Sequence, residues 1–136
     1  MKKKLLKVLA VLAVLAAIAF GAMWLKIEAN EKKLATLPVA EVDVAEIPDG
    51  VYRGSFSFFP VSAEVEVTVA NHAISGIKLL EHMHARGAAA EVIVEKVKDA
   101  QSLEVDLVSG ATFSSKVILK AIEDALVEAA AKNRQK

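Results

Sequence analysis

The chain contains no cysteine among its 136 residues. This absence excludes disulfides, thiolate zinc sites, iron–sulfur clusters and a lipidated cysteine, because each of them needs a thiol. Proline and glycine are also few, with 3 and 6 residues. No internal repeat or low-complexity tract interrupts the sequence. A chain of this length can form one compact core at most, so we expect a single small domain.

An excess of charge of one sign is also lacking, since 17 basic residues balance 17 acidic ones. The balance is uneven along the chain, because four lysines precede Val8 and the part after Leu25 carries 13 basic against 17 acidic residues. Nucleic-acid binding requires clustered Lys or Arg that neutralise phosphates. We therefore expect no nucleic-acid partner.

One long apolar run is present, from Val8 to Leu25, with 18 residues and no charge. A helix of this length reaches about 27 Å, close to the thickness of the hydrocarbon layer of a bilayer. A cleaved signal peptide is the alternative, because small residues near Ala22 could form a cleavage site. The length of the run and Trp24 at its far end favour an uncleaved single-pass anchor. The preceding lysines place the N-terminus inside and the domain outside the cell membrane.

The rest of the chain divides into a spacer, a domain and a polar tail. Residues 26–48 carry Glu and Lys in turn and contain two prolines, which predicts a helical continuation and then an extended spacer that holds the domain off the membrane. The turn signal Asp49-Gly50 opens the domain. The expected limits are 1–25 for the membrane anchor or signal segment, 26–48 for the spacer, 49–131 for the domain and 132–136 for the tail.

The first part of the domain has the period of β-strands. Residues 51–59 and 64–69 alternate apolar and polar side chains, and residues 74–80 return after a turn at Asn71-His72. These patterns predict three antiparallel strands.

The second part of the domain changes period. Residues 88–101 have mainly helical spacing, although Val92 to Val94 would also suit a strand, and residues 103–108 alternate as a short fourth strand. Ser114 or Ser115 would then cap a helix that runs to about residue 131. The expected fold class is α+β, with a small antiparallel sheet packed against two helices in the order β-β-β-α-β-α.

The bend from Asp106 to Thr112 is the most informative stretch. It combines an acidic residue, the hinge Gly110 and the hydroxyl of Thr112 just ahead of a helix start. Small residues allow a second protein to approach the backbone, and the free N–H groups of a helix start favour negative charge. The arrangement suits a covalently attached phosphate group. A plain strand-to-helix turn rich in small residues is the alternative.

Further short motifs accompany this bend. They are Asp49-Gly50-Val51-Tyr52-Arg53-Gly54, Leu79-Leu80-Glu81-His82, Gln101-Ser102, Val105-Asp106, and Ser109-Gly110-Ala111-Thr112 with Ser114-Ser115-Lys116. From Asp49 to about Leu126 the chain thereby resembles the FMN-binding domain family. This domain is found in flavin-bearing subunits of sodium-pumping NADH:quinone reductase and in small exported flavoproteins with one membrane anchor. The Ser-Gly-Ala-Thr group is the specific part of the resemblance.

The resemblance implies that Thr112 carries FMN through a phosphoester bond. An FMN transferase, which uses FAD and magnesium, would install it and would recognise Asp106, Ser109, Gly110 and Ala111. The chain would then be the substrate of a transferase and a relay of electrons between redox donor and acceptor proteins that the sequence does not identify. It would be an electron-transfer protein and not an independent enzyme, since the sequence shows no nucleophile triad. The alternatives are a subunit of a larger membrane redox complex, and a non-redox binding or sensing module on the same fold.

Other side chains are candidates for contact with the flavin. Phe113, Ser114 and Ser115 adjoin the attachment residue, and Tyr52 offers an aromatic face. Phenylalanines 56 and 58 alternate along a strand and are expected in the core.

Two histidines, His82 and His84, fall on one face if the third strand continues. We expect solvated loop histidines here, with His82 as the candidate for flavin contact because the resemblance covers it. Two clustered nitrogens without a cysteine do not make a metal site, so no metal is predicted.

Overall fold

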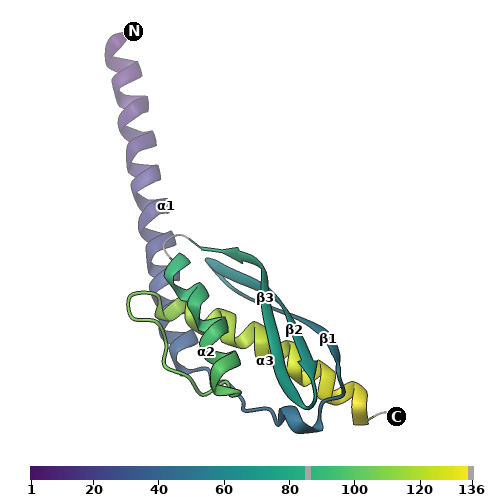
Figure 1. Ribbon diagram of the computed structural model, residues 1–136. Coiled ribbons are helices and arrows are strands. Elements are labelled where there is room, and N and C mark those ends of the chain that lie inside the picture. The colour runs from purple at the N-terminus through teal and green to yellow at the C-terminus, as the bar shows by residue number, and fades with distance from the viewer. Residues whose placement is uncertain (85–86, 135–136) are drawn as a thin grey trace.

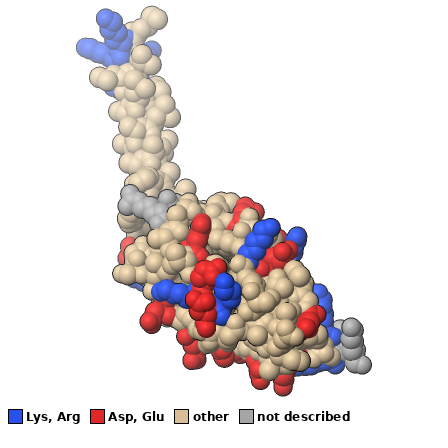
Figure 2. Space-filling view, viewed as in Figure 1, with Lys and Arg blue, Asp and Glu red and all other residues tan. Residues whose placement is uncertain are grey.

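The computed structural model describes residues 1–84 and 87–134 (Figure 1). Helix α1 (Lys2–Thr36) extends away from a small domain in which a sheet packs against helices. Its apolar part has a mean hydropathy of 2.6 and is not buried by the rest of the chain. Basic side chains gather at its free end, and the helix below them is bare of charge (Figure 2). This helix is long and apolar enough to cross a membrane, a property that anchors share with signal sequences.

The sheet has three antiparallel strands, β1 (Gly50–Phe58), β2 (Val61–Ala70) and β3 (Ala73–Met83), in the order β1-β2-β3. Alternate residues of β2 are buried, as a strand with one covered face requires. The turn between β2 and β3 consists of Asn71 and His72, whose φ angles of 53° and 60° are those of the tight turn that matches the twist of a hairpin. The three predicted strands and their turn are confirmed.

Helix α3 (Thr112–Arg134) covers the inner face of the sheet. Its stripe of Ile118, Ile122 and Leu126 is fully buried. The helix approaches β1 most closely at Gly54, where a Cβ atom would overlap backbone atoms of α3. The carboxylate of Asp124 accepts a hydrogen bond from the backbone N–H of Ser55, at 3.0 Å, and so occupies one donor on the free edge of β1.

The segment predicted as a helix over 88–101 begins as a 3₁₀ turn, η2 (Ala88–Val92), and continues as α2 (Ile93–Ala100). Directly after α2, the side chain of Gln101 accepts from the N–H of Ile74 at 2.7 Å and donates to its carbonyl at 2.8 Å. This pair of bonds satisfies the edge of β3 in the way that a neighbouring strand would.

The predicted fourth strand at 103–108 is wrong, because this segment has no regular secondary structure and pairs with no strand among the described residues. Three of its backbone donors, those of Leu103, Glu104 and Val108, bond to side chains instead, and the N–H of Val105 donates to the carbonyl of Leu103 at 3.0 Å. The N–H of Leu103 donates to Glu41 at 3.1 Å, and the N–H of Val108 donates to the hydroxyl of Ser115 at 3.1 Å. The fold class is still α+β, with the three-stranded sheet packed against helices.

The chain between α1 and β1 packs against the domain. Leu34 at the end of α1, Val44 in the 3₁₀ turn η1 (Val44–Glu46) and Ile47 are all buried in the core. The limits proposed above for the spacer, domain and tail stay a prediction, and Gln135 and Lys136 of the tail lie outside the described residues.

Polar side chains of α3 hold this connecting chain along its length. Lys116 donates to the carbonyl of Ala35 at 2.9 Å, Glu123 accepts from the N–H of Ala40 at 3.1 Å, and Asn133 donates to the carbonyl of Glu46 at 2.8 Å. Helix α1 is thereby joined to the domain through several contacts and not through a free linker.

Candidate functional site

The bend that contains Thr112 is a tight turn followed by the start of α3. The N–H of Ala111 donates to the carbonyl of Val108 at 3.0 Å, and Gly110 between them has a φ of 78°. A Cβ at Gly110 would meet no atom within 4 Å, so glycine is required here by backbone conformation and not by crowding. Thr112 is the first residue of α3 and is exposed, as are Ser109 and Gly110. The bend therefore presents its hydroxyls to solvent.

The two predicted cap residues do not cap α3. The helix begins at Thr112, so Ser114 and Ser115 lie in its first turn, where they are 4% and 0% exposed. The N–H of Ser115 donates to the carbonyl of Ala111 at 2.9 Å, and its hydroxyl accepts from the N–H of Val108. The prediction of a serine N-cap is wrong because Ser115 turns its side chain back to the bend. Val108 and Ala111 of the bend are thus both hydrogen-bonded to Ser115 in the first turn of α3, and Ala111 is buried.

The electrostatic setting of Thr112 favours an anion. The first N–H groups of a helix have no partner within the helix and carry the positive end of its dipole. The first turn of α3 contains no acidic residue that would compete for them. Asp106 is exposed on the other side of the bend, and its carbonyl accepts from Lys96 at 3.2 Å. A phosphate group on the Thr112 hydroxyl would lie next to donors at this helix start.

An aromatic row leads from the bend to the sheet. The ring of Phe113 is 6.2 Å from that of Phe58, and Phe58 stacks on Phe56 at 6.3 Å. Both β1 phenylalanines pack against the core, as expected. Tyr52 does not join this row, because it lies six residues before Phe58, roughly 20 Å along an extended strand. Its hydroxyl donates to the carbonyl of Pro48 at 2.8 Å.

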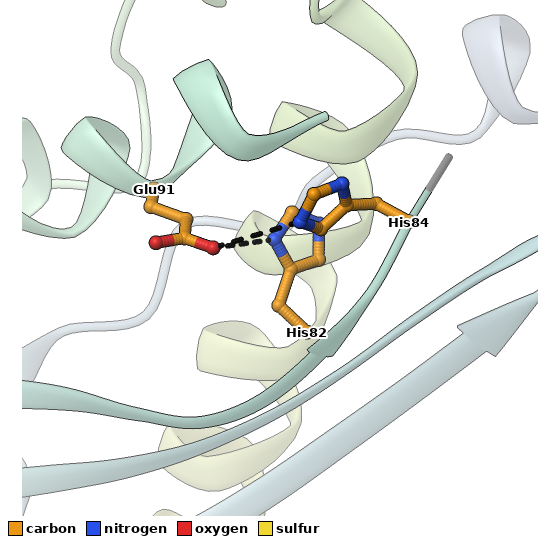
Figure 3. Close-up of side chains that lie close together, drawn as sticks. All are labelled: His82, His84 and Glu91. Atoms are coloured by element: carbon orange, nitrogen blue, oxygen red, sulfur yellow. Dashed lines mark hydrogen bonds and ion pairs between the residues drawn. The ribbon is translucent and has the colours of Figure 1, made fainter. Parts of the chain in front are cut away.

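His82 and His84 meet Glu91 of η2 at the end of β3 (Figure 3). His82 lies opposite Ala63 on the inner face of the sheet, and its side chain is only 2% exposed. The expectation of a solvated loop histidine is therefore wrong for His82. The pairing of β3 with β2 places His82 on the buried face of the sheet. Sequence analysis also missed Glu91, since no local pattern relates it to β3.

Gly87 connects this histidine pair with the bend. Its N–H donates to Nδ1 of His84 at 3.1 Å. A Cβ at Gly87 would overlap the hydroxyl oxygen of Ser114, so the backbone here lies directly against the first turn of α3. The structure therefore brings His84, Ser114 and Thr112 into one region.

The hydrogen bonds of His82 and His84 oppose metal binding at the two ring nitrogens that lie nearest Glu91. Nδ1 of His82 lies 3.2 Å from the Glu91 carboxylate and donates to it, and Nδ1 of His84 accepts from Gly87, which leaves the proton of a neutral ring on Nε2. A metal would need a lone pair on Nε2 of His84, and that atom keeps its proton as long as Nδ1 accepts from Gly87. The remaining nitrogen, Nε2 of His82, is a buried acceptor without a partner among the described residues.

We expect nitrogen NMR spectra to show opposite tautomers for the two rings. In their neutral forms, His82 should carry its proton on Nδ1 and His84 on Nε2. A His84→Gln variant identifies which resonances belong to which ring, and His72 on the distant turn is the internal reference. The same tautomer at both positions would contradict the hydrogen bonds described above.

Comparison with protein families matches residues 61–127 to a family described as FMN-binding domain. The match includes β2, β3, the histidine pair, the bend and most of α3. Comparison with curated proteins gave no match.

Proposed function

We propose that this chain, whose domain belongs to the FMN-binding domain family, is a membrane-anchored flavoprotein that carries FMN on Thr112 and relays electrons outside the cell membrane. The observation that carries the proposal is the exposed hydroxyl of Thr112 at the first residue of α3, within the Ser-Gly-Ala-Thr bend and inside the matched range.

The residues around the bend are suited to FMN. A phosphoester on Thr112 places negative charge at the start of α3, where unpaired N–H groups stabilise it. The buried Nε2 of His82 is an acceptor that an N–H donor of a ring system would satisfy, and Phe113 supplies an apolar face close to the bend. FMN supplies the ability to take up two electrons and release them one at a time. The protein supplies attachment and surroundings.

The exposure of the bend supports its modification by a second protein. A threonine hydroxyl needs a base to become nucleophilic, and no carboxylate or histidine contact to the Thr112 hydroxyl is present among the described residues, so the base belongs to the transferase. Ser109, Gly110 and Asp106 of the bend are exposed, and no side chain of Gly110 blocks the approach. These residues are the surface that an FMN transferase recognises, with FAD as donor and Mg²⁺ as its metal.

Helix α1 supports the location. Its free end carries four lysines, which by the positive-inside rule stay in the cytoplasm, and the domain then lies on the other side. A covalent bond keeps the cofactor on the protein outside the cell, where free FMN would be lost by dilution.

The proposal is tested by expressing the full chain with and without an FMN transferase and isolating it from membranes. The transferase would move FMN from FAD to the hydroxyl and release AMP, so the intact mass should rise by that of FMN less one water, and the band should fluoresce after denaturing electrophoresis. After reduction with dithionite, addition of ferricyanide should restore the flavin absorbance while the fluorescence stays with the chain. A colourless chain of unmodified mass beside an active transferase would overturn the attachment. A bound flavin that accepts no electrons would overturn the relay.

A further inference from the structure

We propose that the hairpin tip, formed by Phe59 and Pro60 between β1 and β2, rests on the outer surface of the bilayer that α1 crosses. The inference rests on the proposed function, because it takes α1 as a membrane anchor. It adds a second contact between the chain and the membrane, made by the domain itself.

The hairpin tip meets α1 at the level where the apolar run ends. Asn30 of α1 donates to the carbonyl of Phe59 at 2.8 Å, and the amine of Lys26 lies 5.5 Å from the centre of the Phe59 ring. Lys26 is the first charged residue after the run that closes at Leu25. The end of the sheet that contains the hairpin tip lies beside α1 (Figure 1). If the run spans the hydrocarbon layer, the hairpin tip is at the layer of lipid headgroups.

The side chains at this level are those that the interface favours. Phe59 is 48% exposed, and it is the only exposed aromatic residue of the described domain, residues 49–84 and 87–134. Met83, at the end of β3 and paired with Ser62 next to the tip, is 59% exposed. Trp24 is exposed on α1 just before Lys26. Aromatic rings with a neighbouring lysine concentrate at the boundary between headgroups and acyl chains.

The contact is confined to the hairpin tip and the adjoining end of β3. Glu64 and Glu81, which pair across β2 and β3, are the next acidic side chains along the outer face of the sheet. Carboxylates are repelled by anionic headgroups, so they keep the rest of this face in water. The partner that fits the tip is therefore the interfacial layer of the bilayer.

Contact of the hairpin tip with the bilayer also fixes the distance of Thr112 from the membrane surface. Lys116, one turn after Thr112, bonds to the carbonyl of Ala35. Ala35 lies nine residues beyond Lys26 on α1, which corresponds to roughly 14 Å along the helix. The bend would then be held about one helix diameter above the headgroups.

The absence of cysteine allows the test by single spin labels. Phe59→Cys and Met83→Cys place labels at the proposed contact, Val14→Cys places one in the middle of the apolar run, and Val51→Cys places a control at the far end of β1, where the side chain is 58% exposed. The full flavinylated chain is placed in nanodiscs of phosphatidylethanolamine and phosphatidylglycerol. Collision rates with oxygen and with a water-soluble nickel chelate are measured for each label. Covalent flavin on each variant reports that its domain has folded.

The labels at 59 and 83 should collide with the nickel chelate several-fold less often than the label at 51. Equal rates at 51, 59 and 83, with the label at 14 protected, would overturn the inference and leave the anchor intact. A label at 14 that collides with the nickel chelate as often as the label at 51 would instead overturn the membrane anchor of the proposed function.

Discussion

Replacing Thr112 with valine is expected to remove all covalent FMN from the chain. Valine keeps the β-branched shape and lacks the hydroxyl, so no phosphoester can form. Thr112 is exposed at the first position of α3, and a surface substitution of this kind changes the free energy of unfolding by roughly 0.5 kcal/mol or less. The loss of flavin would therefore report chemistry at one atom and not loss of the fold. Intact mass and in-gel fluorescence after co-expression with the transferase are the measurements.

Two control variants define the result. Thr36→Val removes an exposed threonine hydroxyl at the end of α1, outside the bend, and should leave the covalent flavin unchanged. Thr112→Ser retains a hydroxyl and should retain some modification. Flavin that persists on Thr112→Val would move the attachment to another hydroxyl, and Ser109 would be the first to examine by peptide mapping.

Replacing Gly54 with alanine is expected to destabilise the domain by about 3 kcal/mol, at the upper end of the cost of overpacking a core. A Cβ here would overlap the carbonyl oxygen of Ala121 and would lie 2.8 Å from the Cα of Ala125. These are backbone atoms of α3, which cannot rotate away, so the helix as a whole must move off β1. Pulse proteolysis of the full chain in urea would measure the change through the domain's resistance to cleavage.

Gly76→Ala is the matched control. Gly76 lies in β3, where a Cβ would meet no atom within 4 Å and φ is not in the left-handed region. Alanine there should leave stability unchanged or raise it slightly, because it reduces the freedom of the unfolded chain. Equal unfolding midpoints for the two variants would contradict the close approach of α3 to β1.

The sheet could be predicted from the sequence because its signals are local. The alternation in β1 and β2 and the Asn71-His72 turn each depend on residues adjacent in the chain. The segment 103–108 has the same alternation, yet the N–H groups of Leu103 and Val108 donate to Glu41 and Ser115. A loop and a strand with the same alternation differ in the partners of their backbone groups, and here one partner, Glu41, comes from a distant part of the sequence.

The candidate site, like the fold, could be predicted from the sequence only where its signals are local. The small residues and hydroxyls of the bend indicated an exposed turn before a helix, which the structure contains. The burial of His82 depends on the register between β2 and β3, and the position of Glu91 depends on the packing of η2 against the sheet. Neither follows from the pattern of residues around the histidines. The contact of Gly87 with Ser114, which joins the two halves of the site, is likewise a property of the assembled fold.

The bonds from Lys116, Glu123 and Asn133 to the chain between α1 and β1 bear on how electrons would reach this protein. A flavin on a loose linker can search a volume for its partners. A flavin on a domain clamped to its anchor can only diffuse laterally with the bilayer and turn about the membrane normal. Under the proposed function, donor and acceptor would have to present their own redox groups at the height of the bend, and proteins that reach to another height would be excluded as partners whatever their potential.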